Sequence, residues 1–225
     1  MLNPVVDLAV DIARKAGAKI FIDADSDSEE LRQMIPKIDV FVASEFVYNA
    51  MFDGGDRQEN CKKVMELGPE IVVFTFGEKG CIGMTKGGYF ELPVYKVDVV
   101  DTVGAGDVYH GAFLAGLLKG YSAEYTAKLA SAVSAIKCTR IGGRAGIPDL
   151  ETAQHFMETG VINYTDIDAR VEFIKGINMY KSGKYRLGVA PTKRSFLSME
   201  EAKRQKDKFM ARIRAISLKQ WKSSM

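Results

Sequence analysis

Several features that define whole classes of protein are missing from this sequence. Only three cysteines occur among 225 residues. Cys61, Cys81 and Cys138 include no CxxC pair and are odd in number, so they indicate neither a disulfide framework nor a zinc site. No apolar run approaches the roughly 20 residues that cross a bilayer, and the N-terminus lacks the basic region and cleavage site of a signal peptide. We therefore expect a cytoplasmic protein with incidental thiols.

Two common nucleotide-binding motifs are absent as well. The P-loop pattern GxxxxGK[ST] occurs nowhere in the chain. The dinucleotide fingerprint GxGxxG fails because Gly104 and Gly106 are followed by Tyr109 where the third glycine should stand. These two spacings exclude the motifs that most often signal a phosphate site.

The formal net charge of +2 conceals an uneven distribution. Of the 31 Lys and Arg and 29 Asp and Glu, residues 161–225 contain 15 and 6, which leaves 16 and 23 for residues 1–160. A basic tail can bind nucleic acid, but no zinc-finger or RNP pattern accompanies this one, and its charges interleave with apolar residues. We interpret it as a solvated helix face and expect neither a nucleic-acid nor a membrane partner.

Short apolar runs alternate with helical patterns in the first part of the chain. Strands are predicted over 18–23, 39–42 and 70–76, and helices over 4–17, 28–34 and 57–67. This alternation predicts a parallel α/β sheet. Glycine turns and short extended runs between 81 and 100 then predict a hairpin at the sheet edge, followed by long helices over 105–119 and 122–139.

The segment 101–112, DTVGAGDVYHGA, carries the strongest chemical signal. Glycines before a helix leave backbone N–H groups uncovered, and the helix dipole adds positive charge. Gly104, Ala105 and Gly106 are therefore predicted to form an anion hole for a phosphoryl group. Asp107, in the first helical turn, would act as a general base toward a substrate hydroxyl. An ordinary helix cap is the alternative for Asp107.

This segment resembles the C-terminal signature of the PfkB family of carbohydrate kinases, which includes ribokinase and fructokinase. Further motifs follow in family order: TFGEKG at 75–80 resembles the T-x-G-x-x-G turn, and TRIGGRAGIP at 139–148 resembles the closing loop. The resemblance covers residues 4–158, about the last half of the family domain. It implies a ribokinase-like, mainly parallel sheet flanked by helices, without the N-terminal half and lid. The implied activity is ATP-dependent phosphorylation of a hydroxyl on a sugar or related small molecule.

The resemblance also implies a role for each matching position. Asp107 falls on the catalytic base, and Asp101 falls in a loop that binds a monovalent cation. The positions near the nucleotide are Thr75, Gly77, Gly80, Ser131 and Gly143, with Ser131 beside the adenine. Turn formation explains the glycines equally well, and helix packing explains Ser131 equally well. The implied cofactors are ATP and Mg²⁺, with K⁺ as a further one.

The chain departs from the family in two respects. The N-x-x-E motif, associated with magnesium, is replaced by SEFV at 44–47, where Glu45 is either a partial substitute or an exposed residue at a helix start. The half-domain that carries most sugar contacts in the family is missing, which would leave a sheet edge unpaired. We therefore expect a homo-oligomer, a complementing N-terminal chain, or cover from the chain's own helices within 165–221. A non-catalytic nucleotide-binding or interaction protein, derived from a truncated sugar kinase, is the alternative function.

Residues 161–225 are expected to form a basic helical extension after a kinase portion at 1–160. Thr165 to Asp168 and Ser198 to Glu201 have the spacing of capping boxes, each before an amphipathic pattern. Two helices are therefore predicted in this extension.

Overall fold

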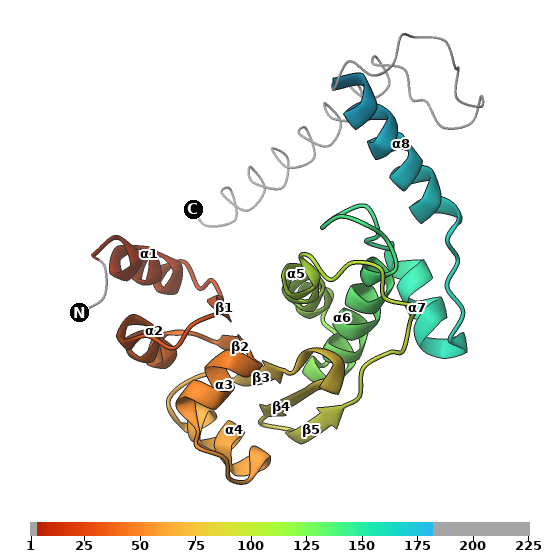
Figure 1. The fold of residues 1–225 in the computed structure, drawn as a ribbon. Helices are drawn as coiled ribbons and strands as arrows, with labels where there is room; N and C mark the ends of the chain where they lie inside the picture. Colours follow the sequence, from red (N-terminus) through yellow and green to blue (C-terminus); the bar gives the residue numbers. More distant parts are fainter. Residues whose placement is uncertain (1–3, 182–225) are drawn as a thin grey trace. The chain divides into compact units, whose positions relative to one another are not determined.

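A five-stranded sheet in the order β1-β2-β3-β4-β5 organises the fold (Figure 1). The structure is a computed structural model that describes residues 4–181, with side chains for residues 4–173. Residues as far as Ile174 belong to one compact unit. The strands are β1 (Phe21–Ala24), β2 (Val40–Ser44), β3 (Ile71–Thr75), β4 (Cys81–Thr85) and β5 (Gly88–Leu92). The second predicted capping box, at 198–201, lies outside the described residues.

The sheet is mainly parallel, as predicted. β1 pairs with β2 and β2 with β3 in parallel, whereas β4 is antiparallel to both β3 and β5. Four of the five strands therefore point the same way, and the predicted hairpin is β4 with β5. Among the described residues β1 pairs only with β2, so β1 is an edge strand.

The helices begin mostly where short polar side chains can cap them. Ser28, Asp56, Ser122 and Asp149 each accept a backbone N–H from the residue three positions later, which satisfies one of the free donors of a helix start. The α-helices are α1 (Pro4–Lys15), α2 (Glu29–Met34), α3 (Glu45–Met51), α4 (Arg57–Glu66), α5 (Ala105–Leu118), α6 (Ala123–Cys138), α7 (Leu150–Thr159) and α8 (Thr165–Lys181). Two short 3₁₀ turns are η1 (Ile35–Lys37) and η2 (Gly77–Lys79).

The two faces of the sheet bury different sets of side chains. Phe41 and Phe74 point to the face covered by the first four helices, and Val42 and Val73 point to the face covered by α5 and α6. Figure 1 shows these helices on opposite sides of the strands. Both faces are apolar because β2 and β3 are buried on both sides, as expected for inner parallel strands.

Two details differ from the sequence-based predictions. Helix α7 was not predicted, although Asp149 caps its start and Gly160, with φ of 73°, ends it. Thr165 lies inside the first turn of α8 and is not its cap, and its N–H donates to the side chain of Asn163 at 3.1 Å. The competing Asx turn at Asn163 explains the shift of the helix start.

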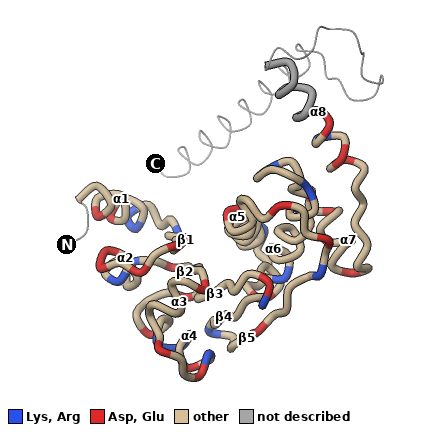
Figure 2. The backbone as a smooth tube through the Cα atoms, in the orientation of Figure 1, with Lys and Arg blue, Asp and Glu red and all other residues tan. Residues whose placement is uncertain are grey.

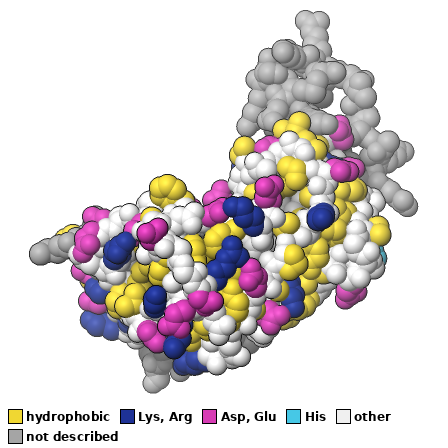
Figure 3. Space-filling view, turned by 60° about the horizontal axis from the view of Figure 1, so that its bottom comes forward, with side chains coloured by type: hydrophobic (Ala, Val, Ile, Leu, Met, Phe, Trp, Pro, Cys, Tyr) yellow, Lys and Arg dark blue, Asp and Glu magenta, His cyan; other side chains and the backbone are white. Residues whose placement is uncertain are grey.

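Charged groups are spread over the helices and loops, and the strands β2, β3 and β4 contain none. Figure 2 shows acidic and basic residues interspersed along the helices and loops, and Figure 3 shows hydrophobic side chains reaching the surface between them. The exposed apolar residues include Leu8 and Ile12 on α1 and Leu114 and Leu118 on α5. Within the part of the chain that the structure describes, no helix is both long enough and apolar enough to span a membrane.

Candidate active site

Polar residues gather where the parallel strands end. Asp23 is the third residue of β1, Glu45 directly follows β2, and Thr75 ends β3. The carboxyl ends of β1, β2 and β3 lie at one edge of the sheet because these strands are parallel. This edge is where α/β proteins bind their ligands.

Helix α5 begins close to this edge. Oδ2 of Asp23 lies 2.5 Å from Nδ1 of His110, which is one turn after Asp107. His110 is buried, and its ring meets the edge of Phe21. The pKa of Asp23 is raised overall: burial is the largest cause, His110 opposes it, and the carboxylates of Asp25 and Asp107 raise the pKa further. Asp107 therefore acts electrostatically on the end of β1.

The turn before α5 has a backbone conformation that favours glycine. Gly104 adopts a left-handed conformation with φ of 73°, and a Cβ there would lie 3.3 Å from the Cα of Gly143. Both facts favour glycine. The N–H of Ala105 donates to the carbonyl of Thr102 at 3.0 Å, so anion binding would fall mainly to the other N–H groups of the first turn, including that of Gly106.

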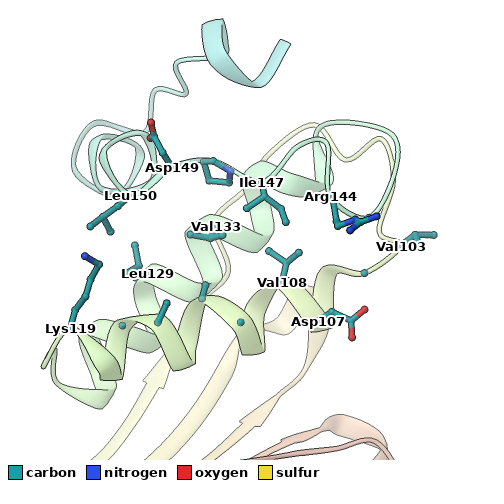
Figure 4. A pocket seen from close by; sticks show the side chains of 17 residues that line it. Val103, Asp107, Val108, Lys119, Leu129, Val133, Arg144, Ile147, Asp149 and Leu150 are labelled. Atoms are coloured by element: carbon teal, nitrogen blue, oxygen red, sulfur yellow. The ribbon is translucent and has the colours of Figure 1, made fainter. Parts of the chain in front are cut away.

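A pocket of about 690 Å³ adjoins this turn. Apolar side chains of α5 and α6 form much of its wall, and residues 143–150 close it. Asp107 and Arg144 lie at one end, and Lys119 and Leu150 lie at the other (Figure 4). The pocket brings together three predicted site residues, namely Gly104, Asp107 and Gly143.

The other predicted nucleotide residues do not line this pocket. Thr75 ends β3, and its Oγ1 lies 3.4 Å from the carbonyl of Ala43. Gly77 begins the turn η2 with φ of 55°, and Gly80 follows its end with φ of 91°. A Cβ on Gly80 would lie 2.0 Å from the carbonyl oxygen of Leu92, so the turn itself requires this glycine. Its structural role stands whether or not a nucleotide binds here.

Two further predicted residues have well-defined surroundings. Glu45, at the start of α3, pairs with Lys79 of the η2 turn at 2.7 Å. It therefore joins the ends of two strands and is not simply an exposed helix-start residue. Ser131 is buried within α6 with an exposed fraction of 8%, in line with the helix-packing alternative.

Asp101 connects the loop before α5 with the segment after α6. Its carboxylate accepts the N–H groups of Val103 at 2.9 Å and Gly142 at 2.7 Å. The N–H of Gly142 and then that of Val103 lower the pKa of Asp101. Its backbone carbonyl accepts a hydrogen bond from the Nζ of Lys137 at 2.8 Å.

Sequence reasoning missed Lys137 and the pair of Asp23 and His110. A signal existed for Lys137, because it is a charged residue in the otherwise small and apolar run ASAVSAIKC at 130–138. No comparable signal existed for the pair, because only the fold brings β1 and α5 together.

The pattern of the pfkB family of carbohydrate kinases matches residues 1–150 of this chain. The chain belongs to this family. Among curated relatives of this PfkB chain is an ATP-dependent 6-phosphofructokinase of Thermoanaerobacterium thermosaccharolyticum, 35% identical over 125 residues, which are 55% of this chain and 38% of the relative. The ribokinase of Haemophilus influenzae is 27% identical over 158 residues, or 68% of this chain and 52% of the relative.

Solved structures agree with the family assignment and the ribokinase-like fold. An E. coli protein provisionally named ribokinase II, solved with ATP and Mg²⁺, superposes with a TM-score of 0.62 at 25% identity, covering 68% of this chain and 53% of that one. Thermotoga maritima ribokinase superposes with a TM-score of 0.55 at 27% identity, covering 67% and 52%. The PfkB chain thus spans about half the length of these relatives, or less.

Proposed function

We propose that this chain supplies the general base and the anion hole for ATP-dependent phosphorylation of a hydroxyl on a sugar or related small molecule. The observation that carries the proposal is the position of Asp107 beside the left-handed Gly104, in the first turn of α5. The side chain of Asp107 is exposed, so an incoming hydroxyl could reach it.

The chemistry follows from this arrangement. Asp107 would accept the proton of the substrate hydroxyl while that oxygen attacks the γ-phosphorus of ATP, and the bond from this phosphorus to the bridging oxygen would break to release ADP. The N–H groups at the start of α5 would stabilise the negative charge on the transferred phosphoryl group, and the helix dipole acts in the same direction. Both groups belong to one helix start, which keeps the base and the anion hole at a fixed separation.

The nucleotide is proposed to extend from this turn toward the η2 turn and α6. Thr75, Gly77 and Gly80 would contact its phosphates, and Gly143 the closing side, whereas the burial of Ser131 within α6 favours a packing role for that residue. The ion pair between Glu45 and Lys79 supports this placement, because it brings the η2 turn beside the end of β2.

Mg²⁺ fits this site only as a partner of the nucleotide. Among the described residues, no three His, Cys, Asp or Glu side chains cluster in a way that could hold a metal ion. Mg²⁺ usually keeps several waters and binds through one or two carboxylates together with substrate phosphates. When bound, it would neutralise phosphate charge, and Asp107 would remain free to accept the proton.

The test compares Asp107→Asn with Asp11→Asn, a matched change of an exposed carboxylate on α1. Phosphoryl transfer from ATP to a panel of ketoses, pentoses and nucleosides is measured together with ATP affinity by calorimetry. We expect Asp107→Asn to lower turnover by at least ~10²-fold with little change in ATP affinity, the usual scale of a lost general base. Equal turnover of both variants would remove Asp107 from the mechanism. Absence of ATP binding by the folded wild-type chain would instead reject the nucleotide site.

A further inference from the structure

Lys137 is a lysine in the protein interior, where charged side chains are rare. It is the second-last residue of α6, and its exposed fraction is 0%. Lysine is almost never fully buried without a partner, because its ammonium group loses its hydration there. Here Nζ donates to the backbone carbonyl of Asp101 at 2.8 Å. The buried ammonium is therefore directed at one loop.

That loop leads directly into the proposed anion hole. Asp101 is three residues before Gly104, and its carboxylate fixes the intervening Val103 N–H. One turn before Lys137, the hydroxyl of Ser134 donates to the carbonyl of Ala105 at 2.9 Å. One face of α6 thus holds both ends of the 101–105 loop.

The ammonium and a monovalent cation at Asp101 exclude one another. A cation bound to the Asp101 carbonyl would lie within a few ångströms of the ammonium nitrogen that already binds the same oxygen. Two positive charges at that separation, away from bulk water, repel strongly. The residues present therefore do not fit K⁺ on this carbonyl while Lys137 is in place.

We propose that the ammonium group of Lys137 is a built-in replacement for a monovalent cation, which positions the 101–105 loop and places a fixed positive charge behind the anion hole. Lys137 is a positioning residue in this scheme, because it contacts the loop and not the phosphate. The proposal rests on the proposed function in that the loop it orders is the proposed anion hole. Its consequence is a kinase site that needs no added K⁺.

The first test uses the wild-type chain. Thermal unfolding and ATP affinity are measured at equal ionic strength in K⁺, Na⁺ and tetramethylammonium chloride. A cation that binds only the folded state stabilises it by RT ln(1 + c/Kd), where c is the free cation concentration, so Tm rises with cation concentration. We expect no K⁺-specific change in either quantity. A K⁺-specific rise in Tm of the wild-type chain would overturn the proposal.

The second test removes the built-in charge. Lys137→Ala should lower Tm by about 5–10 °C in tetramethylammonium, as expected for a lost buried charge contact. About 100 mM K⁺ or NH₄⁺ should then restore a large part of that loss by binding in the vacated position. Lys137→Gln, which removes the charge with less loss of volume, provides the same comparison if the alanine variant does not fold. Lys128→Ala, an exposed lysine on the same helix that pairs with Glu124, is the control and should gain no K⁺ dependence.

The outcomes separate this proposal from the proposed function. Rescue of Tm by K⁺ or NH₄⁺, and not by tetramethylammonium, supports the cation role even if no phosphoryl transfer is found. A folded charge-free variant that no small cation stabilises would show that Lys137 is only a packing residue. If the site also binds ATP, its affinity in the alanine variant should fall about tenfold without K⁺ and recover with it.

Discussion

The two glycines of the α5 turn should respond in opposite ways to the same substitution. Gly104 has a left-handed backbone, and a Cβ there would lie 3.3 Å from Gly143 Cα and 3.7 Å from Asp107 Oδ2. Gly106 is helical, and a Cβ there would meet nothing within 4 Å. A left-handed alanine costs about 1–2 kcal/mol, whereas alanine in a helix gains up to about 1 kcal/mol over glycine.

These values give distinct stabilities for the two variants. Gly104→Ala should lower the free energy of unfolding by about 1–2 kcal/mol, which corresponds to a Tm lower by about 2–8 °C in a chain of this size. Gly106→Ala should leave Tm unchanged or raise it slightly. Differential scanning calorimetry measures both changes.

Gly106→Ala should keep its stability but lose catalytic activity. The Cβ of a helical residue points toward the helix N-terminus, so the new methyl group of Gly106→Ala would occupy space in front of the N–H groups. We expect a loss of phosphoryl transfer on the order of 10²-fold in a variant of full stability, comparable with the loss of one anion-hole donor. Full turnover of Gly106→Ala would refute the placement of the anion hole. A Gly104→Ala variant as stable as wild type would refute the requirement for glycine.

Two further predictions concern buried groups away from this turn. Burial alone would raise the pKa of Asp39, but the Ile20 N–H, Lys19 and Arg14 lower it overall from 3.8. Its stabilising contribution is therefore complete above pH 3.8 and is lost as the pH falls through the lower folded value. Asp39→Asn should reduce the free energy of unfolding by about 2 kcal/mol at pH 7, a modest value because the exposed cationic partners are screened by solvent. Below about pH 3 the reduction should be smaller. Urea titration at both pH values measures the two reductions. Burial raises the pKa of Cys61 to about 12, so a thiol reagent at pH 8 should modify it only after unfolding, and rapid native-state modification would contradict its burial.

The sequence allowed much of the fold to be predicted because the pattern of burial is simple. The inner strands around Phe41 and Phe74 are apolar on both faces, which is the signal of a parallel sheet. The missed helix α7 has a mixed pattern of polar and apolar residues, and its N-cap follows Pro148, so the segment resembled a continuation of the closing loop.

The candidate site was predictable only where its residues are consecutive in the chain. Gly104 and Asp107 belong to one turn, and their relation follows from helix geometry. The contacts of Asp23 with His110 and of Lys137 with Asp101 cross between elements distant in sequence. Neither contact has a local pattern, because each depends on how the helices α5 and α6 settle on the sheet.

The short edge strand β1 has a consequence for the order in which the molecule opens. Its four residues are paired on one side only among the described residues, whereas β2 and β3 are paired on both sides. Edge elements of this kind exchange their amide hydrogens through small local openings, and inner strands require larger ones. Asp23 lies on β1 and touches His110 on α5, so each opening of β1 also removes an anchor one turn away from Asp107. Local opening of β1 and disordering of the turn before α5 are therefore coupled. A ligand that orders this turn should slow amide hydrogen exchange in β1.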